Sequence, residues 1–166
     1  IVVNDTCESS VPGVYAVGDV NGGPQFTYIS LDDFRIVFGA LTGNSQYTLK
    51  DRKNIPYTTF LTPPLSRVGL TEEDAINQGY TVKTKEMLVA TMPRAHVNDY
   101  LKGAFKIVVD ADNDLILGAT LYAQGAEELI NLIKMAMDNN IPYTYFKNQI
   151  FTHPTMAENL NDLCNF

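Results

Sequence analysis

The chain has no long apolar run. Of its 166 residues, 45% are hydrophobic and 19% are charged, which is ordinary for a globular protein. No stretch approaches the roughly 20 apolar residues that a helix needs to cross a bilayer. The apolar start, Ile1-Val2-Val3, is followed directly by Asn4-Asp5 and lacks the basic flank of a targeting segment. We therefore expect a cytoplasmic protein with no membrane partner.

Positive charge and cysteine are also scarce. The formal net charge is -7 at pH 7, which argues against a nucleic-acid partner. The two cysteines, Cys7 and Cys164, lie near opposite ends of the chain, so their spacing suggests neither a disulfide framework nor a zinc site. We predict no metal site. Internal repeats and the Gly-x-Gly-x-x-Gly fingerprint of dinucleotide-binding turns are absent from the sequence as well.

What the chain does contain is a candidate acid–base pair in the segment Thr152-His153-Pro154-Thr155-Met156-Ala157-Glu158. Pro154 keeps His153 out of the helical conformation, so the imidazole is expected on a turn. Thr155 can cap a short following helix, with Glu158 within about its first turn. The Glu158 carboxylate could then fix the tautomer of His153 and leave the other ring nitrogen to exchange protons. This arrangement is a base with an orienting partner and no nucleophile. The alternative is a solvent-facing histidine before a capped helix.

A second candidate site lies near the other end of the chain. The apolar run Val14–Val17 predicts a short buried strand that is closed by Gly18-Asp19. After a glycine loop, apolar residues at helical spacing predict a helix over 27–41. This order would bring Asp19 and the positive end of the helix to the edge of a sheet where α/β proteins bind ligands. It suits a polyhydroxylated or partly anionic ligand, and the alternative is a purely structural turn.

Both motifs resemble signatures of the flavin-dependent pyridine nucleotide-disulfide oxidoreductases, the group of glutathione reductase and dihydrolipoamide dehydrogenase. Residues 11–20, Val-Pro-Gly-Val-Tyr-Ala-Val-Gly-Asp-Val, resemble the second flavin motif of that family. The resemblance implies that Asp19, next to Gly18, hydrogen-bonds a ribityl hydroxyl of FAD. It further implies that Gln25, Phe26 and Thr27 present backbone N–H groups to the pyrimidine edge of the isoalloxazine.

The His-Pro-Thr-x-x-Glu segment resembles the signature of the same family's dimerisation domain. This implies a homodimer in which His153 and Glu158 serve the redox-active disulfide of the partner subunit. The implied cofactors are NAD(P)H, which reduces FAD, and FAD, which reduces the cysteine pair. His153 would move the proton between the attacking and leaving thiols, and Glu158 would hold the imidazole.

The middle of the chain predicts an α+β unit with an antiparallel sheet flanked by helices. Strands are expected at 55–61, 66–70, within 80–91, and at 103–110 and 115–122 as a hairpin, with helices at 72–78 and 126–137 and a helix or loop at 92–97. The helix at 126–137 is almost apolar all round in its middle, so we expect the sheet on one side of it and a subunit interface on the other. With a polar linker starting near residue 49, the resemblance implies that residues 1–48 are a strand-loop-helix remnant of the α/β FAD-binding domain. Residues 49–166 would then be the dimerisation domain.

The resemblance covers only part of such an enzyme, because the redox cysteine pair and the nicotinamide-nucleotide domain are missing from the sequence. We therefore expect the chain alone to be inactive and to bind neither FAD nor NAD(P)H tightly. Pro93-Arg94-Ala95 and residues 159–163 resemble the bacterial reactive-chlorine-resistance flavin reductases, which are allied to the mercuric reductases. The substrate would be a small molecule, a thiol or a metal ion.

Two alternatives stay open from the sequence. In one, the parent enzyme reduces metal ions or oxidants instead of disulfides, and His96 could then be a metal ligand. In the other, the chain is a structural dimerisation module without an enzymatic parent.

Overall fold

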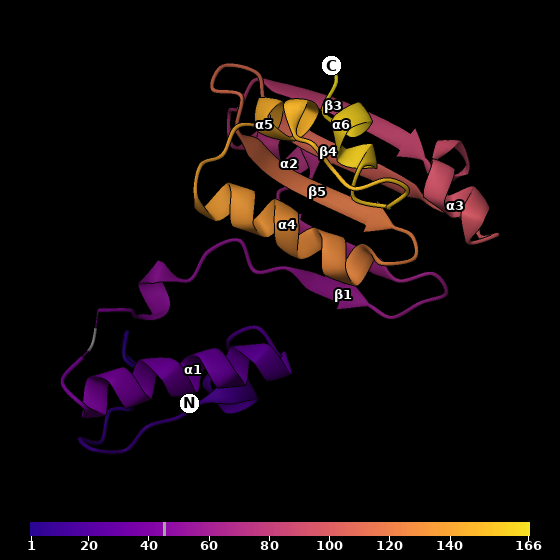
Figure 1. Cartoon of the computed structure of the whole chain (residues 1–166). Helices are drawn as coiled ribbons and strands as arrows, with labels where there is room; N and C mark the ends of the chain where they lie inside the picture. Colours follow the sequence, from indigo (N-terminus) through magenta and orange to yellow (C-terminus); the bar gives the residue numbers. More distant parts are fainter. Residues whose placement is uncertain (45) are drawn as a thin grey trace. The chain divides into compact units, whose positions relative to one another are not determined.

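The computed structural model describes residues 1–44 and 46–166, which form two compact units, Ile1–Lys53 and Asn54–Phe166 (Figure 1). The sequence predicts a junction after residue 48. Residues just beyond that point are tied to the first unit, because Leu49 N–H donates to the Asp5 carbonyl at 2.9 Å and Lys50 pairs with the Asp5 carboxylate at 2.5 Å. Each unit is described below by itself.

The first unit is built around helix α1 (Thr27–Leu41), which has the bounds predicted from the sequence. Its buried face carries Ile29 and Ile36, at helical spacing. The short 3-10 helix η1 (Gly18–Asn21) precedes α1, and η2 (Leu49–Asp51) follows it.

The strand predicted over Val14–Val17 is reduced to one isolated bridge, between Tyr15 and Glu8. A strand needs a ladder of hydrogen bonds with a neighbour, and the described residues of the first unit contain no other strand to supply one. The segment is nonetheless extended where it meets Gly18, with Val17 at φ -127° and ψ 152°. Asp19 therefore still follows an extended stretch, as the sequence predicts.

The second unit is an α+β fold with a five-stranded antiparallel sheet, which confirms the predicted class. The strands are β1 (Tyr57–Thr59), β2 (Leu65–Gly69), β3 (Val82–Leu88), β4 (Ala104–Asp110) and β5 (Ile116–Tyr122), in the order β1-β2-β5-β4-β3. β4 and β5 form the predicted hairpin, whose turn is closed by the Asp110 carboxylate. It accepts hydrogen bonds from Asp112 N–H at 2.9 Å and from the Asn113 amide at 2.7 Å, the local bonding for which Asp is favoured in turns.

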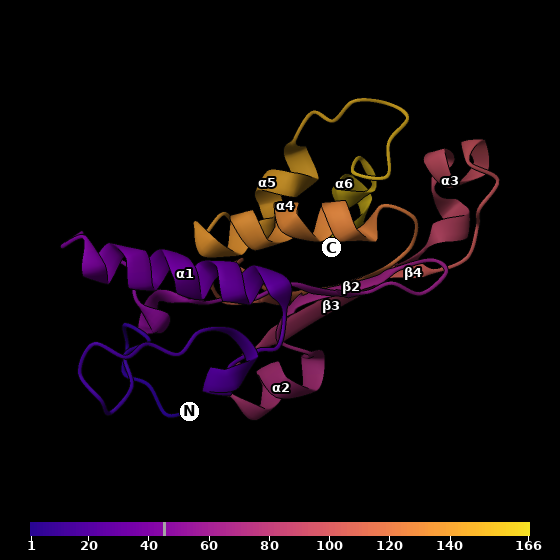
Figure 2. The same ribbon diagram turned by 90° about the horizontal axis from the view of Figure 1, so that it is seen from below.

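Helices lie on both sides of this sheet (Figure 2). On one side is α2 (Glu72–Asn77), which begins with a capping box between Thr71 and Asp74. On the other side are α4 (Ala126–Asp138), α5 (Tyr143–Asn148) and α6 (Asn159–Leu163). After β3 come η3 (Val89–Thr91) and the short helix α3 (Pro93–Val97). Among the described residues, no helix has the length and apolar character needed to cross a membrane.

The core of the second unit lies between the sheet and the layer of α4, α5 and α6. It includes Phe105, Ile107, Val109 and Leu121 from β4 and β5, Leu129, Ile130 and Ile133 from α4, and Leu160 and Leu163 from α6. Burying a side chain of this size contributes about 1.5–3 kcal/mol. The predicted packing of α4 against the sheet is confirmed. Its other side exposes 55% of Met135, and the subunit interface expected there remains a prediction.

Candidate functional site

The loop before α6 brings His153 and Glu158 together, as the sequence predicts. His153 Nδ1 lies 2.8 Å from Glu158 Oε2. The other carboxylate oxygen of Glu158 accepts a hydrogen bond from Thr155 N–H at 3.0 Å, and Thr155 Oγ accepts one from Glu158 N–H at 3.2 Å. Reciprocal bonds therefore close the loop on itself and hold the carboxylate against the imidazole.

The residue that directly precedes α6 is Glu158, and the expectation that Thr155 caps this helix is corrected. Thr155 instead caps the turn 155–158 that precedes the helix, because its hydroxyl accepts a hydrogen bond from Glu158 N–H and donates one to the Thr152 carbonyl at 2.8 Å. The carboxylate of the pair thus sits at the start of a helix whose Leu160 and Leu163 are fully buried in the core.

α6 is also fastened at both of its ends. At the start, the Asn159 amide donates to the carbonyls of Thr155 and Met156 at 3.2 and 3.0 Å. At the end, Lys85 Nζ, on β3, donates to the carbonyls of Asp162 and Asn165 at 2.7 and 2.6 Å. These bonds reach from the helix to the loop and to the sheet, so the position of Glu158 is set by the fold of the second unit.

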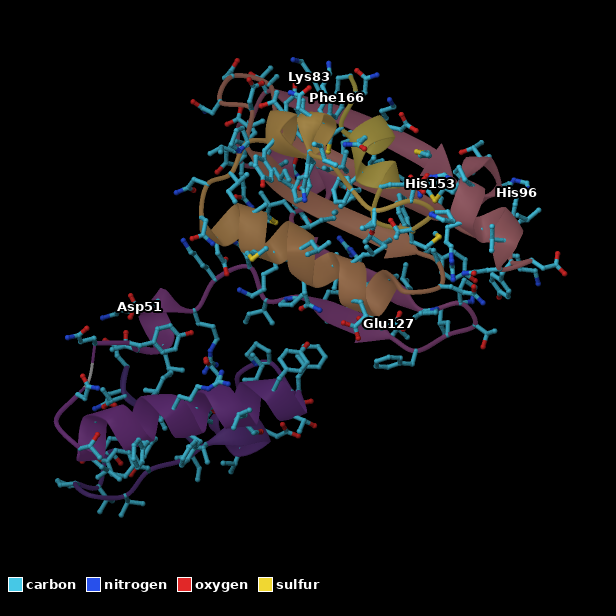
Figure 3. All side chains as sticks on the ribbon, in the orientation of Figure 1. Asp51, Lys83, His96, Glu127, His153 and Phe166 are labelled. Carbon is cyan, nitrogen blue, oxygen red and sulfur yellow. The ribbon has the colours of Figure 1, made fainter. Side chains whose placement is uncertain are left out.

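The charges favour one protonation pattern for the pair. The hydrogen bond from His153, together with that from Thr155 N–H, lowers the pKa of Glu158 against the opposing effect of burial. An ionised carboxylate can only accept hydrogen bonds, so Nδ1 of His153 carries the shared proton and Nε2 is left to take up or release one. The side chain of His153 is 68% exposed, against 19% for Glu158, and it lies on the loop beside α6 (Figure 3).

Neither cysteine of the chain is suited to act as a nucleophile beside the pair. Both cysteines are free and buried, and burial raises the pKa of Cys7 to about 11 and that of Cys164 to about 12. Such thiols form little reactive thiolate at neutral pH. In the part of the chain that the structure describes, no three His, Cys, Asp or Glu side chains are grouped so that they could hold a metal ion.

Gly18 and Asp19, the first two residues expected at a flavin, open η1 in the first unit. Gly18 has a φ of +73°, and a Cβ at this position would lie 2.7 Å from Ser30 Oγ on α1. The left-handed backbone conformation favours glycine at this position, and a larger residue would also push the Ser30 hydroxyl aside. Asp19 is exposed, so its carboxylate can reach a ligand at the surface of the unit.

Gln25, Phe26 and Thr27 form the entry to α1, where the first N–H groups carry the positive end of the helix dipole. Gln25 and Thr27 are exposed, whereas Phe26 is half-buried and its ring stacks on Tyr28 with centroids 5.1 Å apart. Phe26 N–H donates to the Pro24 carbonyl at 3.1 Å. It is thus engaged within the loop, and only the N–H groups of Gln25 and Thr27 remain as expected donors to a ligand.

Sequence reasoning missed Asp33, which is fully buried on α1. One of its carboxylate oxygens accepts hydrogen bonds from Gly18 N–H at 2.7 Å and from the Asn21 amide at 2.8 Å, and the other accepts one from Arg52 Nη2. A signal for it was available, because Asp33 falls on the same helical face as Ile29 and Ile36. A charged residue at a core position needs partners.

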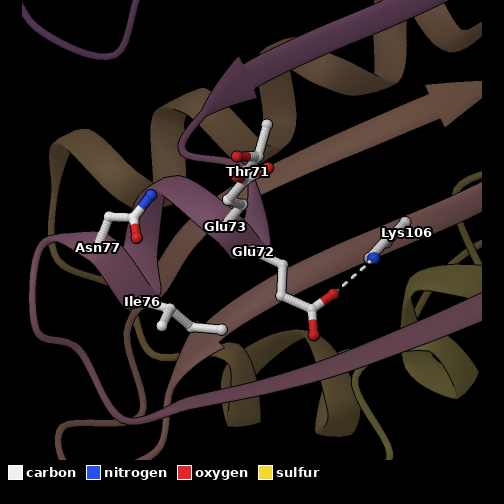
Figure 4. Close-up of a pocket in the computed structure, with 6 residues that line it drawn as sticks. All are labelled: Thr71, Glu72, Glu73, Ile76, Asn77 and Lys106. Atoms are coloured by element: carbon white, nitrogen blue, oxygen red, sulfur yellow. Dashed lines mark hydrogen bonds and ion pairs between the residues drawn. The ribbon is translucent and has the colours of Figure 1, made fainter.

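A shallow hollow of about 490 Å³ on the α2 side of the sheet contains none of the predicted site residues (Figure 4). It is lined by Thr71, Glu72, Glu73, Ile76, Asn77 and Lys106. Its ammonium, on Lys106, is paired with the Glu72 carboxylate at 2.7 Å. The Glu73 carboxylate is a second negative charge in this lining, so the hollow carries a net negative charge.

The sequence of the chain is similar to that of a known protein family. Residues 55–164 match the family model described as pyridine nucleotide-disulphide oxidoreductase, dimerisation domain. The chain is 48% identical over 163 residues to the Escherichia coli protein named probable pyridine nucleotide-disulfide oxidoreductase RclA, covering 98% of this chain and 37% of that protein. It is 34% identical to a mercuric reductase of Lysinibacillus sphaericus, covering 96% of this chain and 29% of the relative.

Solved structures give the same result for the fold. The structure of the HOCl-induced flavoprotein disulfide reductase RclA from Escherichia coli superposes with a TM-score of 0.95 at 47% identity, covering 98% of this chain and 38% of that one. A Cu(II) complex of the same E. coli protein matches with the same TM-score and identity. The chain therefore spans between 29% and 38% of the length of these relatives.

Proposed function

Because the chain belongs to the pyridine nucleotide-disulphide oxidoreductase family and contains its dimerisation domain, we propose that it is the C-terminal part of an FAD- and NAD(P)H-dependent disulfide oxidoreductase. The observation that carries this proposal is the hydrogen bond of 2.8 Å between His153 and Glu158. In the parent enzyme, the pair would supply acid–base catalysis to the redox-active dithiol of the partner subunit. The chain alone would be inactive, because it lacks that dithiol.

The geometry of the pair suits proton transfer to and from a thiol. His153 Nε2, the ring nitrogen that is not bonded to Glu158, would take the proton of the attacking thiol, since the thiolate is the nucleophile in thiol–disulfide exchange. The imidazolium that forms would be stabilised by the ionised Glu158 carboxylate, which already holds Nδ1. The same Nε2 would then return the proton to the leaving thiol.

The first unit has groups that fit FAD. Its exposed Asp19 carboxylate is an acceptor for ribityl hydroxyls, and the entry to α1 at Gln25 and Thr27 presents the positive end of a helix to the electron-rich edge of a flavin. When bound, the flavin would supply the electrons that reduce the disulfide. NAD(P)H would bind elsewhere in the parent. This chain holds only an edge of the flavin site, so weak binding by the isolated chain is expected.

We also propose that the enzyme is a homodimer. Apolar side chains are exposed at successive places along the C-terminal part of the second unit, with Met135 on α4 at 55%, Tyr145 on α5 at 54% and Ile150 on the following loop at 95%. A second copy of the chain would remove such surface from water. Ile150 lies three residues before His153, so burial in a dimer interface would place the imidazole at the subunit boundary.

A second candidate is that the parent reduces metal ions or oxidants instead of a disulfide. It is favoured by a relative named mercuric reductase and by the solved Cu(II) complex of the E. coli relative. The two candidates separate in a turnover assay of the full-length enzyme with NAD(P)H, in which a disulfide such as oxidised glutathione or lipoamide is compared with Hg²⁺ or Cu²⁺.

The proposed role of His153 is tested by His153→Ala in the full-length flavoprotein. We expect disulfide turnover to fall roughly 10²- to 10⁴-fold, the usual loss for a general acid–base, with normal flavin content and normal reduction of the flavin by NAD(P)H. The matched control is His96→Ala, because His96 is the chain's other histidine and is exposed, with Nε2 2.8 Å from the Ala90 carbonyl. Unchanged turnover in His153→Ala would remove the residue from the mechanism.

A further inference from the structure

Asp33 carries a fully buried carboxylate that needs partners, because an unpaired buried charge is costly. Two of its three described donors, Gly18 N–H and the Asn21 amide, come from the two ends of the four-residue helix η1. Both bonds end on the same oxygen, Oδ2. A single carboxylate oxygen therefore joins the start and the end of the turn that carries Asp19.

The third donor, Arg52, holds the carboxylate oxygen of Asp33 that η1 does not contact. Arg52 bonds the other oxygen of Asp33 through Nη2, and its Nε bonds Asp32 at 2.8 Å. The Arg52 side chain is only 10% exposed, and although burial alone would lower its pKa, the hydrogen bonds to Asp33 and Asp32 raise it. Arg52 is thus a permanent cation that holds Asp33 in its orientation, and Asp33 in turn orients η1.

We propose that Asp33 is a positioning residue for flavin binding. Asp33 does not touch the cofactor, but it holds η1 so that Asp19 meets the ribityl chain of FAD. The proposal rests on the proposed function, in which Asp19 binds FAD. Its physical basis is preorganisation: a binding group contributes its full affinity only when supporting groups already hold it in the bound geometry. Without this anchor, part of the binding free energy would be spent on ordering the turn.

The neighbouring residue Asp32 provides a matched control. It is on the same turn of α1 and pairs with the same Arg52, but its other described hydrogen bond comes from Tyr47 OH at 3.3 Å, and none of its described hydrogen bonds comes from η1. Asp33→Asn and Asp32→Asn therefore remove the same charge beside the same guanidinium. Only Asp33→Asn places an amide NH₂ group among the donors that now converge on Asp33.

The experiment is a titration of the apo form of the full-length flavoprotein with FAD, followed by flavin fluorescence well below the unfolding temperature. We expect Asp33→Asn to raise the FAD dissociation constant roughly 10- to 100-fold, the effect of losing one hydrogen bond to a charged group, and Asp32→Asn to change it less than about threefold. The melting temperature of each apoprotein is measured alongside, since a purely structural role would lower stability in both variants without separating their FAD affinities.

Asn21→Ala is a second variant, which keeps both carboxylates and Arg52. We expect it to weaken FAD binding, as Asp33→Asn does. If Asp33→Asn does not fold, Asn21→Ala still tests whether the hydrogen bond from η1 to Asp33 supports FAD binding. Wild-type-like FAD affinity in a folded Asp33→Asn, equal losses in Asp33→Asn and Asp32→Asn, or unchanged affinity in Asn21→Ala would each overturn the proposal. A wild-type protein that binds no FAD would overturn the proposed function as well, so the two failures are distinguishable.

Discussion

Replacing Glu158 with Gln tests whether the carboxylate orients His153. The two carboxylate oxygens accept from two different donors, His153 Nδ1 at 2.8 Å and Thr155 N–H at 3.0 Å. Glutamine has the same shape but only one acceptor oxygen. If that oxygen stays with Thr155 N–H, the amide NH₂ faces Nδ1, and the ring proton must move to Nε2, which can then no longer accept a proton from a thiol.

If the glutamine oxygen instead turns to His153, the NH₂ group meets Thr155 N–H, and two donors oppose each other in the turn. Either arrangement loses one hydrogen bond to a charged group, which is worth about 1.5–3 kcal/mol. At about 1.4 kcal/mol for each tenfold, we expect disulfide turnover to fall roughly 10- to 100-fold. This is a smaller loss than in His153→Ala, because the imidazole is still present.

The assay is steady-state disulfide reduction by the full-length enzyme, with stopped-flow reduction of the flavin by NAD(P)H measured separately. Glu73→Gln is the matched control, since Glu73 is exposed on α2 in the same unit and away from the pair. We expect flavin reduction to be unchanged in both variants and disulfide turnover to fall in Glu158→Gln alone. Turnover within twofold of the wild type in Glu158→Gln would refute the orienting role.

Three further predictions concern the chain itself. Light scattering of this chain across a dilution series should give twice its mass of 18.4 kDa, because a second copy would bury the exposed apolar side chains around α4 and α5. A monodisperse monomer at micromolar concentration would contradict this prediction. Cys7 and Cys164, with pKa values raised by burial to about 11 and about 12, should react slowly with Ellman's reagent at pH 8 until guanidinium unfolds the protein; rapid labelling of both in the native state would show that they are accessible thiolates. Ile133→Ala, at a fully buried position of α4, should lower the free energy of unfolding in urea titrations by about 2–5 kcal/mol. Ile76→Ala, at a position of α2 that is 54% exposed, should change it by less than about 1 kcal/mol. Similar losses at both positions would contradict the assigned core.

Elements with strong local signals could be predicted from the sequence. α1 has the predicted bounds because its apolar residues keep helical spacing and Gly43 follows its end. The hairpin of β4 and β5 was readable because Asp and Asn residues separate two apolar runs. The pairing of His153 with Glu158 was also predictable, since the two residues are only five apart and proline restricts the chain between them.

What the sequence could not predict depends on distant partners. The run Val14–Val17 has the composition of a strand, but a strand is defined by its neighbours, and here it makes only an isolated bridge. Asp33 and Arg52, which form an ion pair, are nineteen residues apart in the sequence, so no local pattern predicts that they pair. The start of α6 at Asn159 was misplaced because Thr155 and Glu158 bond each other and close a separate turn first.

The most direct test of the central claim is the activity of mixed dimers of the full-length enzyme, in which one subunit carries His153→Ala and the other lacks the redox-active cysteine pair. If His153 serves the dithiol of the partner subunit, the mixed dimer has one complete site, made of the cysteines of one chain and the histidine of the other. Each mixed dimer should then have about half of the wild-type turnover, and an equal mixture that reassociates at random, in which about half of the dimers are mixed, should have about a quarter. If mixed dimers form and stay as inactive as their parents, His153 does not act across the subunit boundary, and the account is wrong.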